Sequence, residues 1–162
     1  TLMPELKDRI SQIKKLGFLI KLDTNGTNPK IVEDLIESKL IDYVAMDIKN
    51  SEEKYPLTTG LKTINIEDIK ETISILKNSN IDYEFRTTVV GGLHTEEDFR
   101  GIAAYIQGAE KYFLQCYKDS GNILDKEAGF REPKVDELIA YRDLVRPFVK
   151  NAEIRGVDIE LD

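Results

Sequence analysis

Two acidic side chains follow short apolar runs that predict β-strands. Asp23 comes directly after residues 18–22, and Asp47 comes directly after residues 43–46. Lys49 lies two positions beyond Asp47, and a predicted helix follows each of these loops. When helices and parallel strands alternate, binding and catalytic groups gather at the carboxyl ends of the strands. We therefore expect the chemistry of this chain to reside at these strand ends.

Charged residues also occur within a later apolar run, residues 83–90. Glu84, Arg86 and Thr88 alternate along this run, and alternate residues of a strand share one face. A parallel strand that is buried on both faces normally carries an uninterrupted apolar sequence. These charges therefore need either partners within the protein or a charged ligand.

These acidic and basic residues suit a ligand that carries both a positive and a negative charge. Asp23 and Asp47 can hold an ammonium group or a small cation, whereas Lys49 and Arg86 can bind a carboxylate, Arg86 with two parallel hydrogen bonds. This combination predicts a site for an amino-acid-like zwitterion. The alternative is an internal network of ion pairs that only fixes the sheet.

Helical and strand patterns alternate along the chain with short joints between them. Such joints imply right-handed crossovers and a parallel sheet, so the expected fold class is α/β with parallel βα repeats. A closed eightfold barrel takes roughly 200 residues or more, which predicts a partial barrel at most. Helices are predicted from Leu6 to Leu16 and over residues 29–36, 66–76, 96–106 and 134–149, with N-caps at Asn28, Asn65 and Thr95. Strands are predicted over 18–22, 43–46, 83–90, 112–116 and 153–155. An irregular insertion is predicted over 51–64 and a polar loop over 117–133.

Composition limits the class of protein. A chain of 162 residues with 41% hydrophobic and 33% charged residues predicts one domain, residues 1–162. The net charge of −7 disfavours nucleic acid or an anionic membrane as the main partner. The single cysteine, Cys116, and the single histidine, His94, leave too few ligands for a usual zinc site. Without a long apolar run, a cytoplasmic setting is expected.

Four segments in order resemble the successive strand ends of radical S-adenosylmethionine activating enzymes, such as those of anaerobic ribonucleoside-triphosphate reductase and pyruvate formate-lyase. The resemblance runs from Thr1 to about Tyr117, and residues 118–162 then form a loop, a helix and a terminal segment. It implies that the chain is the C-terminal part of a TIM-like partial (β/α)6 barrel. The segments are Leu22 to Gly26, Tyr43 to Lys49, Glu84 to Val90, and Phe113 to Gln115.

The resemblance also implies a function and a set of binding residues. Enzymes of this family use a [4Fe-4S] cluster to cleave S-adenosylmethionine and generate a glycyl radical on a partner enzyme, here of the anaerobic ribonucleotide reductase or pyruvate formate-lyase type. By analogy, Asp23 and Asp47 hold a monovalent cation, and no residue of this chain is itself catalytic. The implied cofactor-binding residues are Asp23, Thr24, Asn25, Asp47, Lys49, Arg86, Thr88 and Gln115.

Two family motifs are missing from these 162 residues, the CxxxCxxC loop that binds the cluster and the Gly-Gly-Glu-Pro turn. We therefore expect a fragment that lacks the first two strands, binds no cluster and has no radical activity by itself. An unpaired sheet edge would lead the fragment to self-associate, or to cover that edge with its C-terminal segment.

Two other functions fit the residues. Lys49 could form a Schiff base beside Asp47, as in a lyase or aldolase, if burial depresses its pKa. The chain could also be a non-catalytic domain that binds a ligand or a protein. Cys116 is interpreted as a packed strand residue, and His94 as a loop residue rather than a general base.

Overall fold

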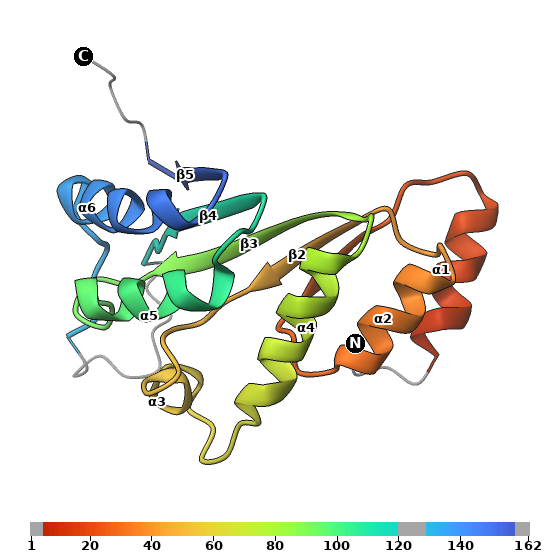
Figure 1. The fold of residues 1–162 in the computed structure, drawn as a ribbon, viewed down its shortest axis with the longest axis horizontal. Coiled ribbons are helices and arrows are strands. Elements are labelled where there is room, and N and C mark those ends of the chain that lie inside the picture. Colours follow the sequence, from red (N-terminus) through yellow and green to blue (C-terminus); the bar gives the residue numbers. More distant parts are fainter. Residues whose placement is uncertain (1–4, 120–128, 158–162) are drawn as a thin grey trace. The chain divides into compact units, whose positions relative to one another are not determined.

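The computed structural model describes residues 5–119 and 129–157. Helices and parallel strands alternate along this part of the chain, and the five-stranded sheet has the order β1-β2-β3-β4-β5 (Figure 1). The sheet is not closed, and the predicted α/β class with parallel βα repeats is confirmed. The elements are α1 Leu6–Lys15, β1 Lys21–Thr24, α2 Pro29–Glu37, β2 Tyr43–Asp47, α3 Tyr55–Thr59, α4 Ile66–Asn78, β3 Asp82–Val89, α5 Glu96–Ile106, β4 Lys111–Cys116, α6 Val135–Val145, the 3₁₀ helix η1 Arg146–Phe148, and β5 Asn151–Arg155.

The chain divides into two compact units. The first unit comprises Thr1–Asp47 and Asn65–Glu84, and the second comprises Ile48–Ile64 and Phe85–Asp162. Strand β3 begins in the first unit and ends in the second. The prediction that residues 1–162 form a single domain stays a prediction.

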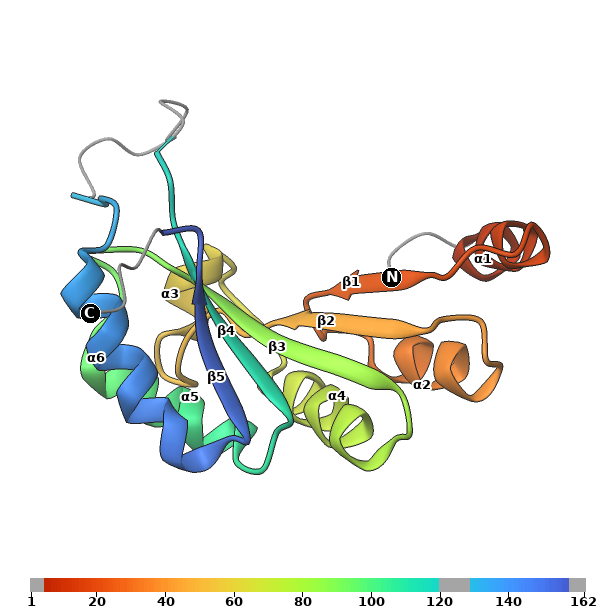
Figure 2. The same cartoon turned by 90° about the horizontal axis from the view of Figure 1, so that it is seen from above.

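The first unit is built on the parallel pair β1 and β2, in which Asp23 lies opposite Ala45. Helices α2 and α4 lie side by side on one face of this pair (Figure 2). Pro29 occupies the start of α2, where its missing N–H is not needed, and Asn65 caps α4 by accepting a hydrogen bond from the Glu67 N–H. The core consists of buried side chains from both layers, among them Leu22, Val32, Leu35, Val44, Met46, Ile69, Ile73 and Leu76.

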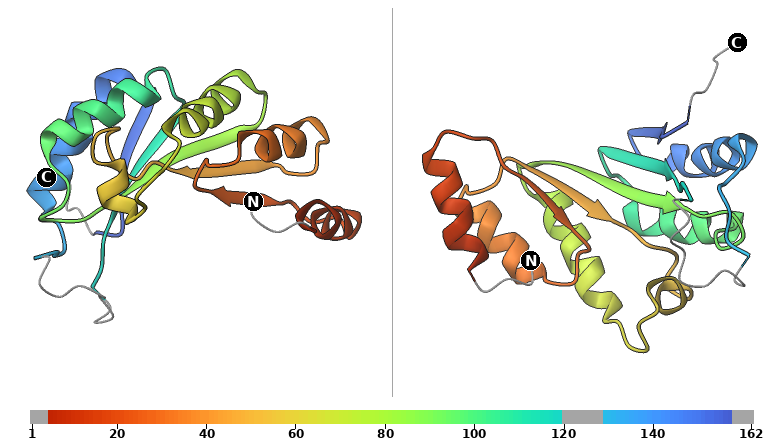
Figure 3. Two further views of the ribbon diagram at one scale, coloured as in Figure 1. Left: turned by 90° about the horizontal axis from the view of Figure 1, so that it is seen from below. Right: turned by 180° about the vertical axis from the view of Figure 1, so that it is seen from behind.

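The second unit is built on β4, β5 and the part of β3 from Phe85 onward, and these strands are parallel to one another. Helices α5 and α6 pack against each other and cover one face of these strands (Figure 3). The predicted N-cap of α5 is confirmed as a capping box, because Thr95 and Asp98 each bind the other's backbone N–H. Buried side chains from helices and strands form its core, including Phe85, Phe99, Ile102, Ile106, Tyr112, Leu114, Leu138 and Val145.

Several predicted boundaries are wrong. The first strand is Lys21–Thr24 rather than 18–22, and both Phe18 and Leu19 are exposed, at 60% and 84%. The insertion at 51–64 contains α3. Asn28 is the N-cap residue of α2, as predicted, but its side chain makes no capping hydrogen bond. The last helix ends at Val145 because Pro147 cannot supply the next helical N–H, so the chain tightens into η1.

The short final strand is confirmed, and it is longer than predicted. It runs over Asn151–Arg155 and pairs with β4 along its whole length. Of the predicted polar loop 117–133, residues 120–128 lie outside the described residues. Within the described part of the chain, no helix combines the length and the apolar character needed to cross a membrane.

Candidate functional site

The loop after β1 is held by its own side chains. The Gly26 N–H donates to Thr24 Oγ1 at 3.1 Å, and Asn25 Oδ1 accepts from the backbone N–H and the hydroxyl of Thr27 at 3.2 and 2.8 Å. Thr72 of α4 donates its hydroxyl to the Gly26 carbonyl at 2.7 Å. The buried Thr24 therefore helps to hold this turn, whereas Asn25 is exposed.

Asp23 and Asp47 lie on the same face of the first unit. Asp23 is exposed and alternates with the buried Leu22 and Thr24, and its register partner is Ala45. Asp47 lies two residues beyond Ala45 and therefore shares its face. Within residues 5–119 and 129–157, no group of three or more His, Cys, Asp or Glu side chains is placed to hold a metal ion. A monovalent cation held by Asp23 and Asp47 stays a prediction.

Glu84 has protein partners, as the ion-pair alternative predicts. Its carboxylate is buried, lies 3.3 Å from Lys21 Nζ, and accepts a hydrogen bond of 3.0 Å from the Tyr43 hydroxyl. The Lys21 ammonium also lies over the Tyr43 ring, 5.3 Å from its centroid. This cluster satisfies a charge that would otherwise be costly to bury, so Glu84 is structural.

In the second unit, Arg86, Thr88 and Gln115 share one face of the sheet. Thr88 lies opposite Gln115 in the register, and Arg86 precedes Thr88 by two residues. The intervening side chains, such as Thr87, are buried on the other face, toward α5 and α6. We call the face with Arg86, Thr88 and Gln115 the open face. Arg86 and Gln115 are half-buried and Thr88 is exposed.

The final strand adds a residue to the open face that the sequence interpretation missed. Arg155 lies opposite Gln115, and its guanidinium carbon sits 3.2 Å from the centroid of the Phe113 ring. This stacking covers Phe113, which is only 5% exposed although it lies on the open face. The sequence could have indicated this position, because Arg155 alternates with the apolar Ile154 in the strand that pairs with β4.

Lys49 follows β2 and is held by its backbone. The Ile48 N–H donates to the Arg86 carbonyl at 2.8 Å, and Thr87 donates its hydroxyl to the Ile48 carbonyl at 2.7 Å. The Lys49 N–H donates to the Tyr55 hydroxyl at 3.2 Å. Residues Arg86 and Thr87 of β3 therefore hold the backbone of Ile48, and Tyr55 holds the backbone N–H of the next residue, Lys49.

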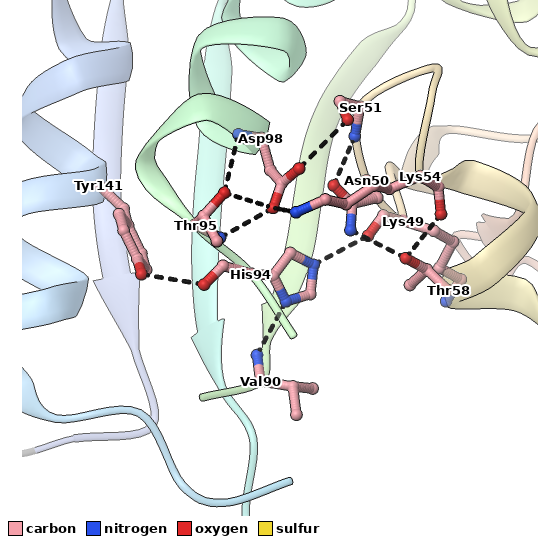
Figure 4. A network of polar contacts seen from close by, with 10 residues as sticks. All are labelled: Lys49, Asn50, Ser51, Lys54, Thr58, Val90, His94, Thr95, Asp98 and Tyr141. Atoms are coloured by element: carbon pink, nitrogen blue, oxygen red, sulfur yellow. Dashed lines mark hydrogen bonds and ion pairs between the residues drawn. The ribbon is translucent and has the colours of Figure 1, made fainter. Parts of the chain in front are cut away.

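A buried polar network surrounds this segment (Figure 4). His94 contacts the Lys49 carbonyl, and Lys54 forms an ion pair of 2.8 Å with the buried Asp98. Burial lowers the pKa of His94, although hydrogen bonds to the backbone at Lys49 and Val90 oppose the shift. At Asp98 burial acts to raise the pKa, but hydrogen bonds from Lys54 and Thr95 prevail and lower it.

The residues of this chain do not fit an iron–sulfur cluster. Such clusters are held by several cysteine thiolates, and the chain contains only Cys116. The Cys116 thiol is half-buried, donates to the Tyr117 carbonyl at 3.4 Å, and has a pKa raised by burial. A cluster would need cysteines from outside these 162 residues.

Residues 1–106 match the Radical SAM superfamily. The chain is also 32% identical, over 160 residues, to a Methanocaldococcus jannaschii protein provisionally named a glycyl-radical enzyme activating enzyme. This match covers 94% of the chain, and the chain spans 66% of the length of that relative.

A solved structure has the same fold. It is a domain of the pyruvate-formate lyase-activating enzyme from Bacteroides vulgatus, which superposes with a TM-score of 0.72 at 17% identity. The match covers 93% of this chain and 89% of that domain. At this identity the similarity extends to the fold alone.

Proposed function

Because this chain belongs to the Radical SAM superfamily, we propose that it is part of an activating enzyme that cleaves S-adenosylmethionine and generates a glycyl radical on a partner enzyme. The 32% identity to a relative with that provisional name supports this activity. We further propose a partner of the anaerobic ribonucleotide reductase or pyruvate formate-lyase type, and a cytoplasmic setting.

One observation carries the binding part of this proposal. Arg86, Thr88 and Gln115 lie together on the open face, in a chain whose match to the superfamily spans residues 1–106. A half-buried arginine on the face of a strand is suited to a carboxylate, and the hydroxyl and amide are suited to the neutral polar groups of a nucleoside. Arg86 would bind the methionyl carboxylate, and Thr88 and Gln115 would bind other polar groups of the same ligand.

Lys49 is proposed to contribute a second positive charge toward that carboxylate. Its backbone is held by Tyr55 and His94, and it comes from the segment that hydrogen-bonds to the Arg86 carbonyl. Asp23, Thr24, Asn25 and Asp47 remain predicted cofactor-binding residues from the first unit. The exposed positions of Asp23 and Asn25 are compatible with contact to a ligand.

S-adenosylmethionine supplies a 5′-deoxyadenosyl radical when it is bound to a reduced [4Fe-4S] cluster. Because the residues present do not fit a cluster, we propose that the 162-residue chain binds S-adenosylmethionine without cleaving it. We also retain the proposal that the chain self-associates through an edge of its sheet.

The test is calorimetric titration of the 162-residue chain with S-adenosylmethionine, repeated for Arg86→Ala and Arg100→Ala. Losing a charge-assisted hydrogen bond costs about 1.5–3 kcal/mol, so R86A should raise Kd about tenfold to about a hundredfold. Arg100 is the matched control, since it lies on α5 and pairs only weakly with Glu96 and Glu97 at 3.6 and 3.8 Å. The proposal fails if the wild-type chain does not bind, or if R86A and R100A bind equally well.

A further inference from the structure

The His94 ring is fixed in one tautomer by its contacts. The Val90 backbone N–H lies 3.1 Å from Nδ1, and a backbone N–H can only donate, so Nδ1 accepts. The ring proton is therefore on Nε2, which donates to the Lys49 carbonyl at 3.0 Å (Figure 4). Both ring nitrogens are engaged, and the residue is only 4% exposed. This arrangement leaves no ring nitrogen available to carry a proton to or from a substrate.

The rest of His94 is held just as firmly. The Tyr141 hydroxyl of α6 donates to the His94 carbonyl at 3.0 Å, and the Tyr141 ring stacks on Phe99, with centroids 4.4 Å apart. Phe99 in turn lies 5.9 Å from the His94 ring. Because the next residue, Thr95, is the N-cap of α5, the histidine is anchored to both α5 and α6.

Two side chains bind the Lys49 backbone, one at its N–H and one at its carbonyl. Tyr55, which is buried, accepts from the Lys49 N–H, and His94 binds the Lys49 carbonyl. A peptide segment held at both its N–H and its carbonyl has little freedom to rotate, so the direction of the side chain at its Cα is also set.

We propose that His94 is a positioning residue that orients Lys49 toward the carboxylate of S-adenosylmethionine. The inference rests on the proposed function, because it assumes that Lys49 contacts this ligand. His94 acts through the Lys49 backbone and does not touch the ligand. The charged and titratable groups near His94 are Asp98 from α5, Lys54 from the segment after β2, and Tyr141 from α6.

Two substitutions separate the contacts of the ring. The amide of Gln in His94→Gln can reach the position of Nε2 and donate to the Lys49 carbonyl. The shorter amide of Asn in His94→Asn reaches only the position of Nδ1, where it can accept from Val90. The proposal predicts that H94Q binds S-adenosylmethionine within about threefold of wild type and that H94N binds about tenfold more weakly. Urea unfolding of both variants shows whether they fold.

Hydrogen exchange gives a second readout that needs no ligand. The Lys49 amide should exchange faster in H94N than in wild type, and H94Q should restore its protection. If the wild-type chain fails to bind S-adenosylmethionine while this pattern holds, the proposed function fails and the positioning of Lys49 stands. If H94N leaves the Lys49 amide protected, or binds the ligand as wild type does, the positioning role is wrong.

The single histidine allows a direct check of the tautomer, since one set of imidazole ¹⁵N signals reports on His94 alone. Signals typical of a neutral ring protonated on Nε2 are expected at neutral pH. A ring protonated on Nδ1 would contradict the contact with the Lys49 carbonyl and overturn the proposal.

Discussion

Thr87 donates its hydroxyl hydrogen bond to the carbonyl of Ile48, with 2.7 Å between the two oxygen atoms. Thr87 belongs to β3, and Ile48 is the residue between Asp47 and Lys49. The same hydroxyl oxygen accepts a hydrogen bond of 2.7 Å from Tyr112 of β4. A short buried chain of hydrogen bonds thus joins two strands of the second unit to the segment that carries Lys49.

Removing the hydroxyl of Thr87, in the middle of these hydrogen bonds, should lower the free energy of unfolding more than removing the hydroxyl of Tyr112 at their end. Thr87 and Tyr112 are 1% and 0% exposed, so Thr87→Val leaves both the Tyr112 hydroxyl and the Ile48 carbonyl without this partner. We expect T87V to lower the free energy of unfolding by about 2–4 kcal/mol, and Tyr112→Phe by about 1 kcal/mol. Urea unfolding measures both, with Thr88→Val at the exposed neighbouring position as the control. Equal losses in T87V and Y112F would contradict this order.

Removing the hydroxyl of Tyr55 should free the N–H of Lys49, whereas His94 binds its carbonyl. Tyr55→Phe keeps the buried ring but removes the oxygen that accepts from the Lys49 N–H at 3.2 Å. We expect the Lys49 amide to exchange faster and S-adenosylmethionine to bind severalfold more weakly. Hydrogen exchange and calorimetry measure these effects. An unchanged affinity together with faster exchange would show that the position of Lys49 does not matter for binding.

The buried His94 should make stability depend on pH. Burial lowers its pKa below the ordinary value of 6.5, so the unfolded chain takes up a proton at a higher pH than the folded chain does. Stability should therefore be fully present above about pH 6.5 and should fall as the pH drops from there toward the folded pKa. The stability of wild type relative to H94Q should decrease between about pH 7.5 and about pH 5.5 in urea unfolding. A constant difference would mean that His94 titrates alike in both states.

The stability of the first turn of α6 should depend on the carboxylate of Glu137. Arg131 binds Glu137 through two hydrogen bonds of 2.8 and 2.6 Å, and Glu137 also accepts from the Lys134 N–H at 2.8 Å. The hydrogen bonds from Arg131, followed by that from the Lys134 backbone, lower the pKa of Glu137 to about 2. Their stabilising effect is present above pH 4.5 and is lost as the pH falls toward about 2.

Because this pair is partly exposed, Glu137→Gln should cost only about 1 kcal/mol near neutral pH. The matched control is Asp136→Asn, which removes a carboxylate from the same helical turn. Urea unfolding at about pH 7 and about pH 3.5 should show the cost of E137Q shrinking on acidification. A cost that is the same at both values would rule out the ion pair as its source.

Gly26 should resist substitution because of both its backbone and its surroundings. Its φ is +77°, and a Cβ at this position would overlap the terminal methyl of Met46. Gly17 has a φ of +85° with nothing within 4 Å of such a Cβ, so Gly17→Ala tests the backbone strain alone. Both variants should lose about 1 kcal/mol from strain, and Gly26→Ala should lose up to about 1 kcal/mol more, because the flexible but buried Met46 side chain must shift. Equal unfolding midpoints would contradict the overlap with Met46.

Local patterns in the sequence predicted most elements because the buried helical faces and strands carry regular apolar spacing. The boundaries failed where apolar residues are not buried. Phe18 and Leu19 continue the apolar run of the first strand but are exposed, so the pairing with β2 starts later, at Lys21. Sequence alone could not show this, because the face of an edge strand is decided by what packs against it.

The site was only partly accessible from sequence. The alternation in β3 correctly placed Arg86 and Thr88 on one face, and the register adds Gln115. Glu84 belongs to the same alternation, yet it is bound by Lys21 and Tyr43. His94 is a loop residue, as the sequence predicts, but its contact with the Lys49 carbonyl could not be predicted. The two residues are 45 positions apart in the sequence. Long-range contacts of this kind leave no local signal.

We propose that this chain belongs to an enzyme that cleaves S-adenosylmethionine reductively. The most direct measurement uses the protein translated from the complete gene, reconstituted anaerobically with iron and sulfide, reduced with dithionite and supplied with S-adenosylmethionine. We predict formation of 5′-deoxyadenosine and methionine, with a rate that Arg86→Ala lowers at least tenfold and Arg100→Ala leaves unchanged. A cluster-loaded protein that forms no 5′-deoxyadenosine would contradict the claim, and equal rates for the two arginine variants would contradict the role of Arg86.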